Sequence, residues 1–210
     1  MMNKVTATKH QSLDVSRNEI HVVAAGAGRG VSRQQWLDTA LKVFATDGVE
    51  AVRIVSLAKT LHISKSGFYW HFKDRKNLLE DMKEYWIEEF NQNIIAAISG
   101  IDIPPKEKLL EAIRTIREKQ GGKFDLAFAA WAQSDASVRV LVDRVTNMRI
   151  AFARNLLAEL GYTGVELEAR VRICVVYFSW SEIMFRRTAA GLEDEPFEEI
   201  LKIIGGPRMS

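Results

Sequence analysis

The stretch Ile63-Ser64-Lys65-Ser66-Gly67-Phe68-Tyr69-Trp70-His71-Phe72-Lys73 is the most informative part of this 210-residue sequence. It combines two hydroxyls, a lysine and a run of aromatic and histidine side chains. One helical turn separates Phe68 from Phe72, so both can anchor the segment to a small core. The polar residues can present hydrogen-bond donors to phosphates or base edges. The stretch therefore predicts a short helix, Ser64 to Phe72, that lies on DNA.

Two further helices are predicted before this one. Ser32 and Gln35 have the spacing of a capping box, and the apolar residues that follow predict a helix to about Gly48. A second helix is expected from about Arg53 to Leu61, and Ser64 is expected to N-cap the third helix through its hydroxyl. Three short helices in about 40 residues form a helix-turn-helix unit, so residues 32–75 are predicted to be a DNA-binding domain.

Helical patterns continue to the end of the chain, and no strand pattern of useful length interrupts them. Asp74 is expected to cap a helix that continues through Ile94, and the next helix is expected from Pro104-Pro105 to a break at Gly121-Gly122. A short apolar segment follows from Phe124 to Trp131, and Ser134 is expected to cap a long helix that ends at Gly161. Two more helices are expected, one capped by Thr163 with Glu166 and ending near Gly191, and a last one from about Asp194 to Ile204. The sequence predicts an all-α protein with a second helical domain over residues 76–210.

Composition limits the class of protein. With 47% hydrophobic and 27% charged residues, most of the chain is expected to fold around a substantial core. The net charge of +2 is unevenly distributed, since residues 1–75 carry 11 Lys and Arg against 6 Asp and Glu. The basic part of the chain is therefore the part that contains the aromatic segment, as expected for a protein that binds DNA.

Residues 1–31 are interpreted as a flexible basic arm, because they show no sustained periodicity. Four basic residues, Lys4, Lys9, Arg17 and Arg29, can follow a DNA groove, although a passive tail is the simpler interpretation. Gly26, Gly28 and Gly30 lack the spacing of a dinucleotide-binding loop. No apolar stretch is long enough to span a bilayer, and no signal peptide is expected, so a soluble cytoplasmic protein without membrane contact is predicted.

Several separately spaced positions resemble the N-terminal domain of the TetR family of transcriptional repressors. They are Gly48, Leu57-Ala58, Ile63-Ser64-Lys65, Gly67 to Lys73 and Leu78-Leu79. The resemblance covers about residues 32 to 80, and beyond it the chain agrees only in being helical and of suitable length. It implies a homodimer that binds a palindromic double-stranded DNA operator and is released by a small-molecule effector.

The resemblance also implies roles for individual residues. The helix from Ser64 enters the major groove, where Lys65 and Ser66 are expected to read bases and Gly67 to permit close approach. Tyr69, His71 and Lys73 are expected to hold phosphates. Each residue also has a plainer interpretation: Tyr69 and Trp70 as core, His71 as a helix-end cap and the lysines as solvated. Trp70 is left open between core and a contact to the DNA backbone.

Two positions depart from the family pattern. Val55 occupies a position where the family commonly has an arginine, and His62 occupies the position of a turn glycine. Arg53 can supply the missing phosphate contact or can simply be solvated. His62 is expected to adopt a positive φ, which histidine tolerates better than β-branched residues do.

The segment from Val171 to Phe185 is apolar almost all round. Val171, Cys174, Phe178 and Phe185 share one stripe, and Ile173, Tyr177, Trp180 and Met184 share another. One stripe can be covered by this domain, so the second is predicted to meet a copy of itself. A homodimer through the helix of about 165–190 is expected, with Ile173, Tyr177, Trp180 and Met184 at the interface.

Aromatic residues are frequent after residue 85, and they can line an effector cavity or simply fill a core. The candidates for effector binding are Trp86, Phe90, Phe128, Trp131, Phe152 and Tyr177. The four histidines, His10, His21, His62 and His71, all precede residue 76, so no catalytic or metal site and no cofactor is predicted. Cys174, the single cysteine, is interpreted as a buried apolar residue rather than a redox sensor.

The predicted function is therefore that of a transcriptional regulator, with repression favoured, and the protein is not expected to be an enzyme. The alternative is an all-helical small-molecule binding or enzymatic protein whose N-terminal helices are only a scaffold. A third possibility is a nonspecific nucleoid protein. Salt-sensitive binding to duplex DNA separates the first from the scaffold alternative, and preference for a palindrome separates it from the third.

Overall fold

The computed structural model describes residues 30–185 and 197–206, and every regular element within them is a helix. The predicted all-α fold is confirmed. Contacts separate Met1–Gly30 from Val31–Ser210, and the fold below is that of the second unit. The predicted basic arm, with Lys4, Lys9, Arg17 and Arg29, lies outside the described residues. No described helix is both long and apolar enough to cross a membrane.

The first helix, α1 (Arg33–Asp47), begins as the sequence predicts. The Ser32 hydroxyl accepts from the Gln35 amide at 3.2 Å, and the Ser32 amide donates to the Gln35 side chain at 2.8 Å. This capping box satisfies two backbone donors that a helix N-terminus leaves open. After Gly48, which has a φ of 80°, a short 3₁₀ turn η1 (Val49–Ala51) leads into α2 (Ile54–Thr60).

The turn after α2 is closed by His62, which has a φ of 54°. The His62 amide donates to the Lys59 carbonyl at 3.1 Å, and the Ile63 amide donates to the Ala58 carbonyl at 3.0 Å. These two bonds form a Schellman motif, in which the residue after the helix adopts the left-handed conformation and is usually glycine. The predicted positive φ of His62 is therefore confirmed.

The segment from Ile63 to Lys73, called the recognition segment below, differs from the prediction in the type and the bounds of its helix. It forms a 3₁₀ helix, η2 (Lys65–Trp70), in place of an α-helix from Ser64 to Phe72. A segment this short gains little from α-helical cooperativity, and its ends are already fixed by the turn and by buried aromatic rings. Ser64 stands at the N-cap position but makes no capping bond, because its hydroxyl pairs with that of Ser66 at 2.6 Å.

The helix that follows contains a π turn. Asp74 caps α3 (Arg75–Ile87) by accepting from the Asn77 amide at 2.8 Å, as predicted. The chain then passes through η3 (Glu88–Gln92), which is π-helical, into α4 (Asn93–Gly100). The sequence predicts one uninterrupted helix here, and the single extra residue of a π turn leaves no mark on an apolar pattern.

The remaining helices are α5 (Pro105–Glu118), α6 (Gly121–Trp131), α7 (Ala136–Glu159), α8 (Gly164–Phe185) and α9 (Phe197–Gly205). Two predicted boundaries are wrong. Gly121-Gly122 open α6, and the break falls at Gln120, which has a φ of 51°. Asp135, rather than Ser134, caps α7 by accepting from the Ser137 and Val138 amides. The predicted helix limits at Gly191 and Asp194 lie outside the described residues.

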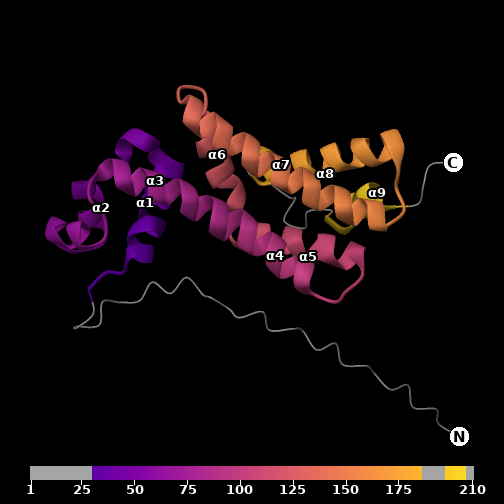
Figure 1. The fold of residues 1–210 in the computed structure, drawn as a ribbon, viewed down its shortest axis with the longest axis horizontal. Helices are drawn as coiled ribbons and strands as arrows, with labels where there is room; N and C mark the ends of the chain where they lie inside the picture. Colours follow the sequence, from indigo (N-terminus) through magenta and orange to yellow (C-terminus); the bar gives the residue numbers. More distant parts are fainter. Residues whose placement is uncertain (1–29, 186–196, 207–210) are drawn as a thin grey trace, which may run out of the picture. The chain divides into compact units, whose positions relative to one another are not determined.

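Gly161 ends α7 as predicted, with a φ of 91° in a second Schellman motif. Figure 1 shows α7 and α8 side by side, and these two helices pack against each other. The largest core cluster joins α1, α2, η2 and α3 to Phe124, Phe128 and Ala132 at α6. A second cluster lies between α5, α7, α8 and α9. Apolar contacts thus connect the recognition segment to α6 through α1 and α3.

Candidate functional site

Two pairs of aromatic residues divide η2 between core and solvent. Phe68 and Phe72 are buried, with their rings stacked at 5.2 Å, and Phe68 packs edge-on against Trp36 at 5.4 Å. Their predicted anchoring is confirmed. Tyr69 and Trp70 are 59% and 87% exposed, so Trp70 does not belong to the core. The dry core fixes the turn while both exposed rings remain free for contact with a partner.

The polar residues of η2 also face solvent. Lys65 and Ser66 are exposed, and the hydroxyls of Ser64 and Ser66 share one hydrogen bond. A Cβ atom added at Gly67 meets only the Ile63 side chain, at an ordinary 3.5 Å. The protein itself therefore has room for a larger residue at Gly67, and any requirement for glycine must come from a molecule that approaches the turn.

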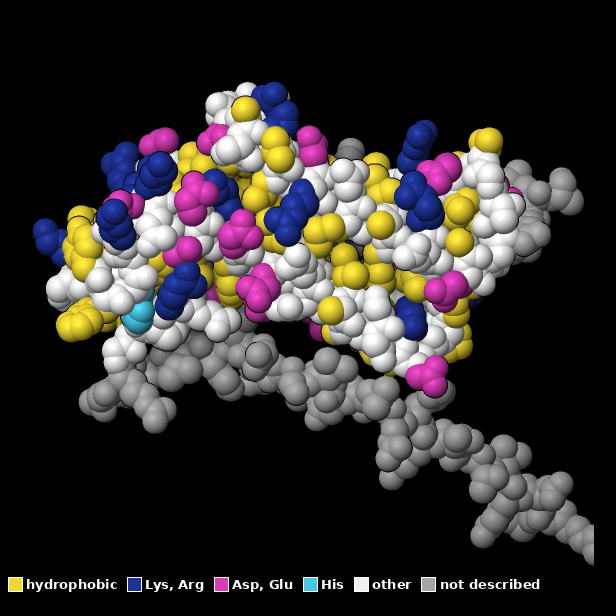
Figure 2. Space-filling view, in the orientation of Figure 1, with side chains coloured by type: hydrophobic (Ala, Val, Ile, Leu, Met, Phe, Trp, Pro, Cys, Tyr) yellow, Lys and Arg dark blue, Asp and Glu magenta, His cyan; other side chains and the backbone are white. Residues whose placement is uncertain are grey.

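The surface around η2 is positively charged. Residues 51–73 contain no Asp or Glu, and their four basic residues, Arg53, Lys59, Lys65 and Lys73, are exposed. None of the four makes an ion pair with a described residue, whereas Asp81 pairs with Arg33 at 2.7 Å and Glu50 lies 3.7 Å from Arg75. Figure 2 shows Lys and Arg gathered with exposed apolar side chains at the end that carries α1, α2 and α3.

Two of the predicted phosphate contacts are partly engaged within the protein. The Nε atom of Arg53 donates to the Glu50 carbonyl at 2.9 Å, which leaves both terminal nitrogens available. Nε2 of His71 lies 2.8 Å from the Val31 carbonyl, and because a carbonyl only accepts, Nε2 must carry the proton. His71 thus ties η2 to the start of α1, and Nδ1 remains for an outside partner. Val55 is exposed and uncharged.

An apolar cavity lies between η3, α4, α5, α7 and α8. Its free volume is about 60 Å³. It is lined by Phe90, Asn91, Ile94, Ile95, Leu109, Ala112, Ile113, Ile116, Arg149, Phe152, Ala153, Cys174, Val175, Phe178 and Ser179. An engineered cavity of about 150 Å³ is known to bind benzene. The cavity is therefore smaller than even a compact aromatic ligand needs.

One end of this cavity is polar. The guanidinium of Arg149 makes two bonds to Asp125, from Nη1 at 2.7 Å and from Nη2 at 2.9 Å. Its Nε donates to the Asn91 side chain at 2.8 Å, and Nη1 also donates to Ser179 at 3.1 Å. The side chains of Arg149 and Asp125 are 19% and 8% exposed. Four elements, α6, α7, α8 and η3, thus meet at one buried charge pair.

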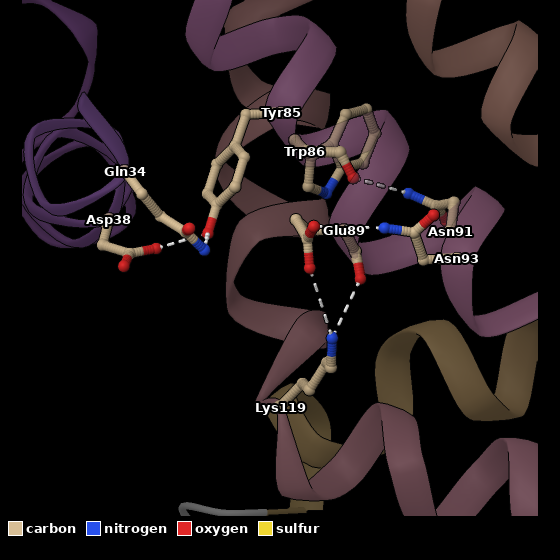
Figure 3. A network of polar contacts seen from close by, with 8 residues as sticks. All are labelled: Gln34, Asp38, Tyr85, Trp86, Glu89, Asn91, Asn93 and Lys119. Carbon is tan, nitrogen blue, oxygen red and sulfur yellow. Dashed lines mark hydrogen bonds and ion pairs between the residues drawn. The ribbon is translucent and has the colours of Figure 1, made fainter. Parts of the chain in front are cut away.

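The π turn connects this charge pair with α3 through Asn91. Figure 3 shows the contacts of Asn91 and Glu89 on the α3 side. Asn91 accepts from Arg149 and donates to the Trp86 carbonyl at 3.1 Å. Lys119 donates to the Glu89 carbonyl at 3.2 Å and lies 3.7 Å from the Glu89 carboxylate. A π turn weakens the regular i to i−4 bonding of a helix, and these side chains supply partners for the Glu89 carbonyl within the turn and for the Trp86 carbonyl just before it.

Tyr85, next to Trp86, extends the connection to α1. Its hydroxyl donates to Asp38 at 2.6 Å and accepts from Gln34 at 3.2 Å (Figure 3). Burial raises the pKa of the Tyr85 phenol, and donation to Asp38 raises this pKa further. The phenol therefore stays protonated over the physiological range, and its bond to Asp38 is retained.

The predicted effector residues separate into two groups. Phe90 and Phe152 line the cavity. Trp86 and Phe128 are buried in the core, stacked at 4.0 Å, and Trp131 packs beside Phe128. Tyr177 packs edge-on against Phe178 outside the cavity lining. Trp86, Phe128 and Trp131 therefore fill the core that joins the N-terminal helices to α6, which was the other interpretation of the sequence.

The predicted interface residues lie on α8. Val171 and Cys174 are buried, whereas Ile173 is 55% exposed and Val176 is also exposed. Tyr177 and Trp180 are half-buried, and the side chain of Met184 lies outside the described residues. On α7, Val140 is exposed beside Arg144, Asn147 and Met148 in a shallow surface depression. Both helices thus present partly apolar outer faces to solvent.

Sequence reasoning missed the polar end of the cavity. Asp125 stands in the apolar segment from Phe124 to Trp131, Asn91 follows Phe90, and Arg149 precedes Ile150. A single charge in an apolar helical stretch is a usable signal, because such a residue is buried only when it has a partner. The pairing of these charges across four elements is not visible in the sequence.

Cys174 lies in the cavity wall. Burial raises the pKa of its thiol to about 12, so the thiol is protonated and unreactive. Among the described residues, no three His, Cys, Asp or Glu side chains are grouped as a metal site requires.

Comparison with known proteins assigns the N-terminal region. The sequence pattern of "Bacterial regulatory proteins, tetR family" matches residues 37–82. The chain is also similar to the HTH-type transcriptional regulator AcrR of Shigella flexneri, with 36% identity over 53 residues, which is 25% of each chain. The aligned segments span between 25% and 37% of the length of the curated relatives matched. Sequence similarity to these relatives thus covers between 25% and 39% of this chain.

The fold likeness extends over most of the chain. A TetR transcriptional regulator from Legionella pneumophila has a TM-score of 0.68 and 16% identity, over 85% of this chain and 97% of the other. AibR, solved in complex with isovaleryl coenzyme A and operator DNA, has a TM-score of 0.63 and 15% identity, over 84% and 99%. At such identities the likeness concerns the fold alone. Residues 37–82 thus match the tetR family of bacterial regulatory proteins, and most of the chain is similar in fold to TetR transcriptional regulators.

Proposed function

We propose that this protein is a DNA-binding transcriptional repressor that acts as a dimer on a palindromic operator and is released by a small molecule. The observation that carries the proposal is the η2 surface: Lys65, Ser66, Tyr69, Trp70 and Lys73 are held out to solvent over a buried aromatic pair, in a stretch without acidic residues. Regulators of this family are not enzymes. Because its partner is genomic DNA, we place the protein in the cytoplasm.

The residues of η2 have two tasks in this proposal. Lys65 and Ser66 read base edges in the major groove, where lysine bonds guanine acceptors and serine accepts or donates. Tyr69 and Lys73 hold phosphates, with Arg53 through its terminal nitrogens. His71 contributes indirectly by fixing the turn, because its Nε2–H is donated to the Val31 carbonyl and its Nδ1 can only accept. The exposed indole of Trp70 lies against the DNA backbone. Gly67 permits the close approach, which agrees with the finding that no contact within the protein requires glycine there, since an added Cβ would meet only the Ile63 side chain at 3.5 Å.

The dimer in this proposal forms through the outer faces of α7 and α8. Exposed Val140, Ile173 and Val176, with half-buried Trp180, supply apolar area. A bidentate ion pair, Arg154 to Glu168 at 2.8 and 2.9 Å, joins α7 to α8 and makes the two helices one surface. A two-fold arrangement of these faces places two η2 segments on two half-sites, which explains why a palindrome is expected.

The apolar cavity is the effector site in this proposal. AibR, which has a similar fold, was solved with isovaleryl coenzyme A and operator DNA, so ligand binding in this fold is compatible with a regulator of DNA binding. At about 60 Å³ the cavity must widen to admit a ligand. Its walls include Phe90 and Asn91 of the π turn, so widening displaces the helix that leads to the DNA-binding region.

The displacement has a polar route to α1. Arg149 donates a hydrogen bond to Asn91, and Asn91 donates one to the Trp86 carbonyl. The adjacent Tyr85 donates one to Asp38 on α1. A π turn can convert to regular α-helix, which shifts the residues before it relative to those after it. In a dimer this shift changes the separation of the two η2 segments, and affinity for a fixed half-site spacing falls.

The test begins with duplexes selected from a random pool by the full-length protein. We expect a palindromic sequence to emerge, and we expect Lys65→Ala and Trp70→Ala to weaken binding to it in a gel-shift titration. Lys106→Ala removes an exposed lysine of α5 and is expected to leave the affinity unchanged. Failure to select any sequence, or equal affinity for all duplexes, would contradict the proposal.

A further inference from the structure

The polar end of the cavity shows which ligands it can accept. Arg149 has five N–H donors, and four of them are used, two by Asp125, one by Asn91 and one by Ser179. One Nη2–H is left. The Ser179 hydroxyl accepts from Arg149 and retains its own hydrogen. The cavity therefore offers two N–H or O–H donors to a ligand and is otherwise apolar.

The charge of this end is already balanced. Arg149 and Asp125 form a bidentate pair at 2.7 and 2.9 Å, and Arg149 is the only charged residue among the described residues that line the cavity. The Cys174 thiol adds no charge, because burial raises its pKa to about 12. A neutral pair in an apolar surrounding leaves no net field to attract an ion.

An anionic ligand is disfavoured on these grounds. A carboxylate bound at Arg149 must either displace Asp125, which leaves a buried acid unpaired, or share the guanidinium with it, which places two negative charges on one positive charge. Both arrangements are unfavourable where water is excluded. A cationic ligand is disfavoured as well, because it meets the positive guanidinium while both carboxylate oxygens of Asp125 are occupied.

We infer that the cavity binds an uncharged, mainly apolar molecule with one hydrogen-bond acceptor, such as a hydroxyl, amide or ester oxygen, placed at Arg149 and Ser179. The aliphatic part lies against Ile94, Leu109, Ile113 and Phe152. This inference rests on the proposed function of the cavity as the effector site, and it adds the chemical class of the effector. The ligand's oxygen contacts the guanidinium that holds Asn91, so binding acts directly on the π turn.

The test uses three probes with one six-carbon chain: hexan-1-ol, hexanoate and hexylammonium. Binding to the full-length protein at pH 7 is measured by isothermal titration calorimetry. Hexan-1-ol is expected to bind, with hexanoate and hexylammonium weaker by at least about tenfold, since an unpaired buried charge opposes them. Equal or tighter binding of hexanoate overturns the inference, and so does an absence of hexan-1-ol binding.

Two variants sharpen the test. Asp125→Asn keeps the shape of the side chain and frees the charge of Arg149, so the preference is expected to shift toward hexanoate. Asp102→Asn makes the same change at an exposed acid outside the cavity and is expected to keep the wild-type order. If Asp125→Asn does not fold, Ser179→Ala replaces it, with weaker hexan-1-ol binding expected and an unchanged affinity counting against the inference.

The operator separates this inference from the proposed function. If hexan-1-ol binds selectively and leaves operator affinity unchanged, the ligand class stands and the proposed release by an effector fails. If the protein binds no selected duplex and still prefers hexan-1-ol over hexanoate, the proposed function fails and the chemistry of the cavity stands.

Discussion

The candidate DNA-binding region, residues 31–82, and the body, residues 85–185 and 197–206, place their polar side chains in opposite ways. In the first, Lys65, Ser66 and Tyr69 face solvent while Phe68 and Phe72 hold the turn from beneath. In the second, Asp125 and Arg149 lie inside, and the apolar cavity is built around them. In the candidate DNA-binding region, the residues proposed to contact DNA are thus different from those that stabilise the fold. In the body, the residues proposed to contact the effector are also those that stabilise the fold.

This difference has a consequence for mutation. A surface residue of η2 can change its contacts with a partner at little cost to the fold. A residue at the polar end of the cavity cannot, because removing either charge leaves the other buried without a partner.

The largest effect is expected from Arg149→Met, which leaves Asp125 buried and unpaired. The free energy of unfolding is expected to fall by about 3–5 kcal/mol, measured by urea denaturation. The double variant Arg149→Met/Asp125→Leu is expected to recover most of this loss. Arg154→Met breaks a bidentate pair with Glu168 whose side chains are 41% and 44% exposed, and it is expected to leave the free energy of unfolding almost unchanged because water screens the pair. Similar losses for Arg149→Met and Arg154→Met would remove the contrast.

The second effect concerns neighbours within one turn. Phe68→Ala is expected to lower the free energy of unfolding by at least about 3 kcal/mol, because it empties a fully buried site. Trp70→Ala, two residues away, is expected to change it by no more than about 0.5 kcal/mol and to weaken duplex binding. Thermal unfolding and gel-shift titration check the pair. A large stability loss in Trp70→Ala would mean that the ring belongs to the fold.

The third effect distinguishes a residue that contacts bases from one that contacts phosphates. Lys65→Ala is expected to lower affinity for the selected operator by about 1–3 kcal/mol and to relax preference at one base pair. Lys73→Ala is expected to weaken binding to all duplexes alike and to reduce the slope of log K against log salt by about 1. Fluorescence anisotropy over a range of salt concentrations distinguishes the two. Identical behaviour of both variants would contradict the assigned roles.

The fourth effect lies on the connection between the two regions. Tyr85→Phe removes the bond to Asp38 and is expected to cost about 0.5–1.5 kcal/mol of stability. The informative measurement is the ratio of the operator affinity with hexan-1-ol to that without it. In Tyr85→Phe this ratio is expected to lie closer to one than in the wild type. If stability falls and the ratio stays at the wild-type value, Tyr85 supports the fold without carrying the coupling.

The smallest effect is expected at Cys174, whose contribution to stability is not expected to depend on pH near neutrality. Burial raises the pKa of its thiol from 9.0 to about 12. The unfolded chain loses this proton first, so the stabilising contribution is complete below pH 9 and is lost as pH rises toward 12. The difference in the free energy of unfolding between the wild type and Cys174→Ala is expected to fall as the pH rises through this range. Rapid alkylation of the native thiol at pH 7 would show that the cavity wall is open.

Local signals in the sequence predicted much of the DNA-binding region. The Ser32–Gln35 capping box, the Asp74 cap and the positive φ of His62 follow from the chemistry of neighbouring backbone groups. The exposed and buried sides of η2 follow from the spacing of Phe68 and Phe72. What failed there was the helix type, because the energy difference between one 3₁₀ turn and one α turn is too small for residue patterns to decide.

The body was predicted less well, for a physical reason. Whether Trp86 or Phe90 lines the cavity depends on packing between helices distant in sequence, and both residues fit either role. The π turn adds one residue to a helix without changing its composition. Arg149 and Asp125 are 24 residues apart, and only the folded chain brings them together. Gln120, rather than Gly121, adopts the left-handed conformation, against the usual preference.

Hydrogen exchange, measured by mass spectrometry with and without a duplex selected by the protein, tests directly whether η2 contacts DNA. If η2 is the DNA-reading surface, peptides covering residues 60–75 gain the strongest protection on binding, while peptides of α5, far from η2, change little. Strong protection in α5 with none over residues 60–75 would contradict this assignment of the DNA-binding surface.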